Sequence, residues 1–212
     1  TLGNNSLPSA IGLWKINEGQ TQIESSERAL LDVQISRPER QGELNRINKA
    51  WQQINEGFKQ YETTPRTEEE DKVYTQLKTN WDRWKQDHEE FLRLNREFEQ
   101  QGILNPFETQ IQLLRQNQGN SPAMGAAQKA AAIYRQMRDR ARNNRTSFEA
   151  ATQLLLQDLN INEQTATNAK TAARQDISQT TFWVIAGCLL GPVTAVLLGL
   201  YFSKSLVQKV QE

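Results

Sequence analysis

The sequence has very few of the residues on which most catalytic and metal sites depend. Its 212 residues include one cysteine, Cys188, and one histidine, His88. A disulfide within the chain is therefore impossible, and no cysteine–histidine cluster offers the ligands of a zinc site. We find no nucleophile–base pair, phosphate-binding loop or paired carboxylates at a recognisable spacing. We therefore expect no enzyme activity, no metal and no cofactor.

The sequence also lacks an excess of charge of either sign. Lysine and arginine together number 25, and so do aspartate and glutamate. This balance gives no electrostatic field for nucleic acid and no polybasic patch for anionic lipid, so we expect no nucleic-acid partner. With 11 glycines and 6 prolines, helix breakers are scarce. The polar excess predicts long, solvated helices rather than a thick globular core.

One long stretch near the end of the sequence has no charge at all. The segment 182–202 is uncharged and close to the ~20 residues with which a helix crosses a bilayer. Aromatic residues stand at both of its ends, as in an interfacial belt. We predict a transmembrane helix over 181–202, because the rest of the chain is too polar to bury this segment in a core. The residues named for this transmembrane helix are Phe182, Trp183, Pro192, Tyr201 and Phe202.

Apolar residues recur with a spacing of three to four before this segment, which is typical of bundle helices. The predicted architecture is all-α: an up-down antiparallel four-helix bundle over 1–180, whose last long helix continues into the membrane. Each predicted helix carries one such row of residues, which we call its stripe. The second stripe is Leu44, Ile47, Trp51, Ile54, Phe58 and Tyr61. The third is Tyr74, Leu77, Trp81, Trp84, His88, Phe91, Asn95 and Phe98. The last is Ala130, Tyr134, Met137, Ala141, Phe148, Ala151 and Leu155.

The first stripe combines aliphatic and small residues. A glycine inside a helix costs about 1 kcal/mol, so the close approach of another helix is the expected compensation. A second copy of the same helix is one candidate for that partner, and an alternative is that the glycines are merely tolerated. The predicted dimer-interface residues are Gly12, Ile16, Gly19, Ile23, Ser26 and Leu30.

The helix boundaries carry recognisable signals. The first helix is expected to end near Ile35, and Ser36–Glu39 and Thr67–Glu70 fit capping boxes at the next two helix starts. Glycine and proline within 101–106 interrupt the third helix, and a weaker helical segment follows. Ser121 precedes a proline and is expected to cap the last helix.

Three segments resemble one family of receptors. Residues 203–210 (SKSLVQKV) resemble the start of a HAMP linker, with Lys209 where that linker usually has proline. Residues 13–31 (LWKINEGQTQIESSERALL) and 74–92 (YTQLKTNWDRWKQDHEEFL) resemble helices of the four-helix-bundle sensor domain of methyl-accepting chemotaxis proteins. The resemblance implies a homodimer through the first helix, residues 1–180 outside the cytoplasm at the inner membrane, and a cytoplasmic HAMP-like linker at 203–212 leading to a signalling module.

A few residues are candidates for ligand binding. Arg28 stands where related chemoreceptors hold an anionic ligand, although the family usually has several arginines there. Trp81 and Trp84 fit the bundle core better than an aromatic ligand box. His88 is interpreted as a hydrogen-bonded seam residue, or alternatively as a pH-responsive or ligand-contacting group. Tyr134 and Arg138 complete the candidate set.

Two functions stay open from the sequence. The preferred hypothesis is a transmembrane sensory domain that binds a small molecule or a binding protein and passes the signal through its last helix to a cytoplasmic module. The alternative is a membrane-anchored adaptor bundle whose partners are other helical proteins.

Overall fold

The fold is all-α, as predicted. The computed structural model describes the backbone of residues 2–210 and the side chains of residues 7–185. Within these residues the chain forms helices and no strand. The helices are α1 (Leu2–Leu30), α2 (Arg37–Glu62), α3 (Glu68–Gln100), α4 (Pro106–Arg115) and α5 (Pro122–Val210).

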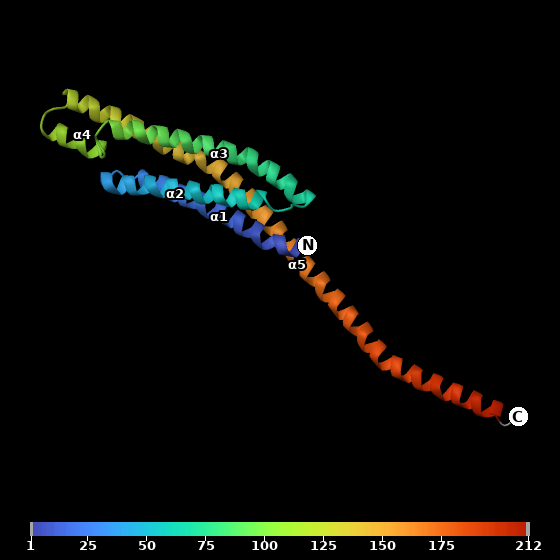
Figure 1. Ribbon diagram of the computed structural model, residues 1–212. Helices are drawn as coiled ribbons and strands as arrows, with labels where there is room; N and C mark the ends of the chain where they lie inside the picture. The colour runs from blue at the N-terminus through green and yellow to red at the C-terminus, as the bar shows by residue number, and fades with distance from the viewer. Residues whose placement is uncertain (1, 211–212) are drawn as a thin grey trace. The chain divides into compact units, whose positions relative to one another are not determined.

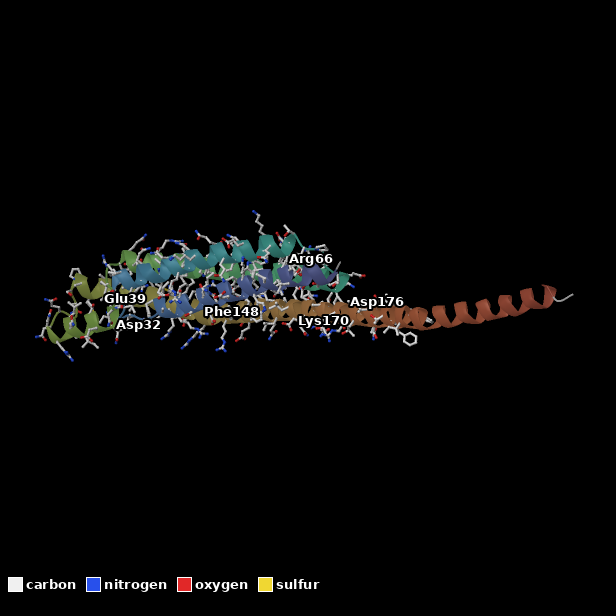
Figure 2. The ribbon with its side chains drawn as sticks, turned by 60° about the horizontal axis from the view of Figure 1, so that its bottom comes forward. Asp32, Glu39, Arg66, Phe148, Lys170 and Asp176 are labelled. Carbon is white, nitrogen blue, oxygen red and sulfur yellow. The ribbon has the colours of Figure 1, made fainter. Side chains whose placement is uncertain are left out.

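The chain divides into two compact units, Thr1–Thr165 and Ala166–Glu212, and the first contains the helical bundle. In this unit α1, α2, α3 and the beginning of α5 lie side by side, and α4 lies at one end (Figure 1). Asp32 and Glu39 lie at that same end, whereas Arg66 lies at the other (Figure 2). The second unit is the remainder of α5.

The predicted helix starts are confirmed. The Ser36 hydroxyl accepts the N–H of Glu39, and the Glu39 carboxylate accepts the N–H of Ser36 at 2.7 Å. Thr67 and Glu70 form the same reciprocal pair at the start of α3. Ser121 accepts a backbone N–H in the first turn of α5. Each capping box satisfies backbone N–H donors that the N-terminus of a helix otherwise leaves unpaired.

The first helix ends earlier than predicted, at Leu30 rather than near Ile35. The Arg40 side chain reaches from α2 and donates to the carbonyl oxygen of Leu30 at 2.9 Å. The following turn is stabilised locally, because the Asp32 carboxylate accepts the N–H of Gln34. A side chain ten residues further along the chain therefore caps this end, and apolar periodicity could not reveal it.

The predicted stripes of α2, α3 and α5 form the interior of the bundle. Their aromatic and aliphatic members pack with α1 into one main cluster. Its fully buried members include Leu13, Ile23, Ile47, Ile54, Leu77, Phe91, Met137, Ala151 and Leu155. The third stripe is buried at every predicted position, including the polar His88 and Asn95.

The six residues assigned to a dimer interface lie instead in the protomer's own core. Gly12 and Gly57 bring the backbones of α1 and α2 together, and a Cβ on Gly12 would lie 2.8 Å from the carbonyl oxygen of Gly57. A Cβ on Gly19 would meet Ile54 at 2.6 Å. The small residues do admit another helix, but that helix is α2 of the same chain. The remaining members, Ile16, Ile23, Ser26 and Leu30, are all fully buried.

The end of the bundle near α4 has small cores of its own. Phe98 packs with Ala130 and Ile133 where α3 ends and α5 begins. The second such core joins α4 to the start of α5 through Leu113, Met124 and Ala127. The predicted break in the third helix is confirmed, since Gly102 has a φ of 72°, which favours glycine.

In the part of the chain that the structure describes, no helix is both long and apolar enough to cross a membrane. Phe182 and Trp183, the first residues of the predicted span, are exposed. The other residues named for it, Pro192, Tyr201 and Phe202, lie outside the residues whose side chains are described.

Candidate functional site

A basic groove lies between α1 and α5. Its volume is about 300 Å³. We call it the arginine groove. It is lined by Glu24, Arg28, Leu31, Arg138, Ala141, Arg142 and Arg145. With four arginines against a single glutamate in this lining, the groove carries an excess of positive charge that favours an anion.

The arginines of the groove differ in whether an acidic side chain forms an ion pair with them. Arg28 forms an ion pair with Glu24 one turn away. Arg145 is held by Glu149 at 2.6 Å, outside the groove lining. Arg138 approaches Asp139 only at 3.8 Å. Arg142 has no ion pair among the residues whose side chains are described. Arg138 and Arg142 therefore hold the most available guanidinium groups.

The structure brings two of the six predicted binding residues into this groove and separates the others from it. Arg28 lines it from α1 and Arg138 lines it from α5. Tyr134 lies one turn before Arg138, and its hydroxyl donates to the carbonyl oxygen of Leu31 at 2.9 Å. Tyr134 therefore ties α5 to the end of α1 beside the groove.

Trp81 and Trp84 are part of the bundle core. Their ring centroids are 4.7 Å apart in an edge-to-face arrangement, and Trp51 of α2 lies 5.5 Å from Trp84. Trp84 is 1% exposed. Edge-to-face packing at these distances is a favourable core geometry. The tryptophans serve to pack α2 against α3.

His88 lies in a buried polar layer between α1, α2 and α3. Its Nδ1 is 2.6 Å from the carboxylate of Glu27, and its Nε2 accepts the indole N–H of Trp51 at 3.2 Å. Because the indole can only donate, Nε2 must be unprotonated, which assigns the ring proton to Nδ1. Burial raises the pKa of Glu27, although His88 acts to lower it.

This layer continues to α5 through the residue before His88. The Asp87 carboxylate accepts from the Ser147 hydroxyl at 2.6 Å and from Arg140 at 3.1 Å, and its backbone carbonyl accepts from Asn144. The side-chain oxygen of Asn144 is buried without a hydrogen-bond partner. Polar contacts, buried at His88 and partly buried at Asp87, therefore link all four long helices.

Sequence reasoning missed several charged residues of the interior. Glu27 and Arg40 are almost fully buried, and neither was a candidate. Asp158 falls on the seam of the last helix and weakens its apolar stripe, which was the only available signal. Arg142 was recognisable only as one member of a run of arginines spread around α5. In the part of the chain searched, no group of cysteine, histidine, aspartate and glutamate could hold a metal ion.

A family model described as a four helix bundle sensory module for signal transduction matches residues 4–120, from α1 through α4. No curated protein and no solved structure matches the chain.

Proposed function

The chain belongs to the four-helix-bundle sensory modules of signal transduction, the type found in chemoreceptors, and we propose that it is the input domain of a transmembrane receptor. In this proposal the bundle lies outside the cytoplasm of a bacterial cell. It performs no chemical reaction. It converts the binding of a ligand into a small displacement of α5 toward the membrane or away from it.

The sequence of the C-terminal segment supports the membrane placement. No charged residue occurs between Asp176 and Lys204, and the apolar run 182–202 is long enough to cross the ~30 Å hydrocarbon core. The HAMP-like residues 203–210 follow at once. This order supports an outside bundle, one span and a cytoplasmic output module.

The arginine groove is the observation that carries the ligand-binding part of the proposal. It is built from α1 and α5, so a ligand that bridges Arg28 and Arg142 contacts both helices. A small carboxylate or phosphate matches guanidinium groups in charge and in planar geometry. An anion that binds one relative position of α1 and α5 more tightly than another shifts their equilibrium.

An exposed apolar face of α1 supports a homodimer. Leu7, Ile11 and Trp14 recur there every three to four residues, and all are exposed, Trp14 at 51%. Beside Trp14 lies an open groove of about 550 Å³, which Arg46 of α2 helps to line. Exposed apolar residues at helical spacing are typical of an interface. We propose that a second copy of α1 covers this exposed face. The face of α1 that the sequence assigned to the dimer is buried inside the protomer.

Two single-cysteine variants test placement and dimerisation together. In a Cys188→Ser background, Asn48→Cys puts a thiol on the exposed side of α2, and Ile11→Cys puts one on the proposed dimer face. On intact cells we expect a membrane-impermeant thiol reagent to label Asn48→Cys. We expect an oxidant to cross-link Ile11→Cys into dimers and to leave Asn48→Cys monomeric.

The two variants serve as controls for each other. Protection of Asn48→Cys until lysis would place the bundle in the cytoplasm and remove the receptor proposal. Equal cross-linking of both variants, or of neither, would contradict a dimer through this face of α1.

A further inference from the structure

Asp158 is a completely buried acid on α5, at the end of the bundle where α2 connects to α3. Its side chain is 0% exposed. The Tyr61 hydroxyl of α2 lies 2.9 Å and 2.8 Å from its two oxygens. Asn162, one turn further along α5, approaches one of these oxygens at 3.5 Å. Asp158 therefore joins α5 to α2 through a single good hydrogen bond.

The partners of Asp158 cannot stabilise a full negative charge. The Tyr61 hydroxyl has one proton to share between two oxygens, and no cation lies within ion-pair distance of Asp158 among the described side chains. An ionised carboxylate in such a site is unfavourable without two or three donors or a cation. Burial raises the pKa of Asp158 to about 7, and the Tyr61 hydroxyl opposes that rise.

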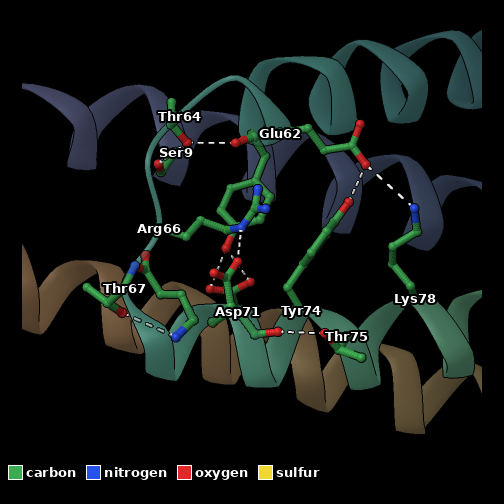
Figure 3. Close-up of polar contacts among 12 residues, drawn as sticks. Ser9, Glu62, Thr64, Arg66, Thr67, Asp71, Tyr74, Thr75 and Lys78 are labelled. Carbon is green, nitrogen blue, oxygen red and sulfur yellow. Dashed lines mark hydrogen bonds and ion pairs between the residues drawn. The ribbon is translucent and has the colours of Figure 1, made fainter.

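Charged groups on the neighbouring elements influence this acid. Figure 3 shows four charged side chains at this end of the bundle: Glu62, Arg66, Asp71 and Lys78. On α3, Glu70 is buried and raises the pKa of Asp158, and Asp71 adds to this effect. Arg66, in the connection before α3, lowers that pKa but gives its Nε to Asp71 at 2.6 Å. The α2 acid Glu62 is occupied by the Tyr74 hydroxyl and by Lys78, and α1 contributes the uncharged Ser9.

Arg66 offers the ionised acid an alternative partner. Its guanidinium lies over the rings of Tyr61 and Tyr74, at 5.5 Å and 4.8 Å from their centroids. One of its terminal nitrogens, Nη1, is buried and has no hydrogen-bond partner. A buried donor without a partner is unfavourable, so a movement that brings it to a carboxylate is stabilising. The neutral acid has no such attraction to Arg66.

We propose that Asp158 is a proton-binding site that makes external pH a second input to α5. With its proton bound, the acid stays between α2 and α5 and holds the two helices together. When the proton leaves, the charged side chain moves toward Arg66 and water, and α5 separates from α2 at this end. The link from this movement to signalling rests on the proposed function, whereas proton binding does not.

The sign of the pH effect follows from the direction of the shift. The folded chain binds this proton more tightly than an unfolded chain, whose aspartate titrates near 3.8. The contribution of Asp158 to stability is therefore fully present below the unfolded value and is lost as pH rises through about 7.

The test uses the full chain in lipid nanodiscs, with spin labels on cysteines at Lys59 of α2 and Gln157 of α5, both exposed, in a Cys188→Ser background. We expect the distance between the labels to widen as pH is raised from 6 to 8. The Asp139→Asn variant, which removes an exposed acid of the same helix, should behave like the parent. Asp158→Asn should keep the short distance at every pH.

A second variant separates proton binding from a merely structural role. Tyr61→Phe removes the one good donor to the carboxylate, so the midpoint of the transition should move to higher pH. The infrared carbonyl band of a protonated, buried carboxyl should titrate with the same midpoint and be missing in Asp158→Asn. A distance that is independent of pH in the parent, a transition that survives in Asp158→Asn, or an unmoved midpoint in Tyr61→Phe would overturn the proposal. Cysteine labelling tests the placement of the bundle separately, so the two proposals can fail independently.

Discussion

Replacing Gly57 by alanine is expected to destabilise the bundle by about 2 kcal/mol, although alanine is the better helix former. A Cβ at this position would lie 2.7 Å from the carbonyl oxygen of Gly12 and 2.8 Å from a side-chain carbon of Ile16. The first of these atoms belongs to the backbone of α1, which cannot yield locally. The helices must therefore separate, and the packing of the surrounding core loosens with them.

Gly42 provides a matched control in the same helix. A Cβ there would meet nothing within 4 Å. Gly42→Ala should therefore stabilise the chain by about 0.5–1 kcal/mol through helix propensity alone. Thermal unfolding followed by circular dichroism in mild detergent would measure both changes. Changes of the same sign in the two variants would contradict the close contact between α1 and α2.

Replacing Arg40 by alanine is expected to cost about 3 kcal/mol. Arg40 is 2% exposed and donates to three acceptors: the carbonyl oxygen of Leu30, the side chain of Asn95, and Glu99 at 2.9 Å. It thereby joins the end of α1 to α2 and α3. Its removal leaves buried acceptors unpaired and Glu99 without its cation, and both effects are unfavourable. Glu99 is one-third exposed, which keeps the loss at the lower end for a buried ion pair.

Arg46→Ala is the corresponding control for Arg40. Arg46 also lies on α2 and pairs with Glu43 at 3.1 Å, but its side chain is 54% exposed. Exposed pairs of this kind contribute about 0.5 kcal/mol or less. Denaturant unfolding should therefore separate the two variants by more than about 2 kcal/mol. Similar midpoints for Arg40→Ala and Arg46→Ala would show that the buried hydrogen bonds of Arg40 do not stabilise the bundle.

The sequence predicted the helices well because local rules determine them. The capping boxes at Ser36 and Thr67 depend on residues three positions apart, and the stripe of α3 depends on a period that is visible in the sequence. The partner of the small residues on α1 was predicted wrongly. Gly12 requires a close neighbour, but a periodic pattern does not state whether that neighbour is α2 of the same chain or another copy.

The candidate site was predictable only in part. Arg28 and Arg138 were named, and they do share a groove, because both positions face the seam between α1 and α5. Glu27 and Asp158 were not named as site residues. Their chemistry comes from burial and from partners such as His88 and Tyr61, which lie far away in the sequence. The available signal in the sequence was the presence of polar residues on an apolar seam. The partners of these residues could be identified only from the structure.

Both proposed inputs act on the same element. The arginine groove is lined by α5 at Arg142, and the proton site lies on α5 at Asp158. Between these two positions, Ser147 of α5 donates a hydrogen bond to Asp87 of α3. This arrangement fits a helix whose position is the signal.

The measurement that tests the central claim most directly is anion binding to the arginine groove. Isothermal titration of the full chain in detergent, with a panel of mono-, di- and tricarboxylates and inorganic phosphate, should identify at least one that binds. Arg142→Ala should weaken this binding by about tenfold or more, as expected for the loss of a charge-assisted hydrogen bond. Arg96→Ala, which removes an exposed arginine from α3, should leave the affinity unchanged. If no anion of the panel binds, or if Arg142→Ala binds as tightly as the parent, the groove is not the ligand site.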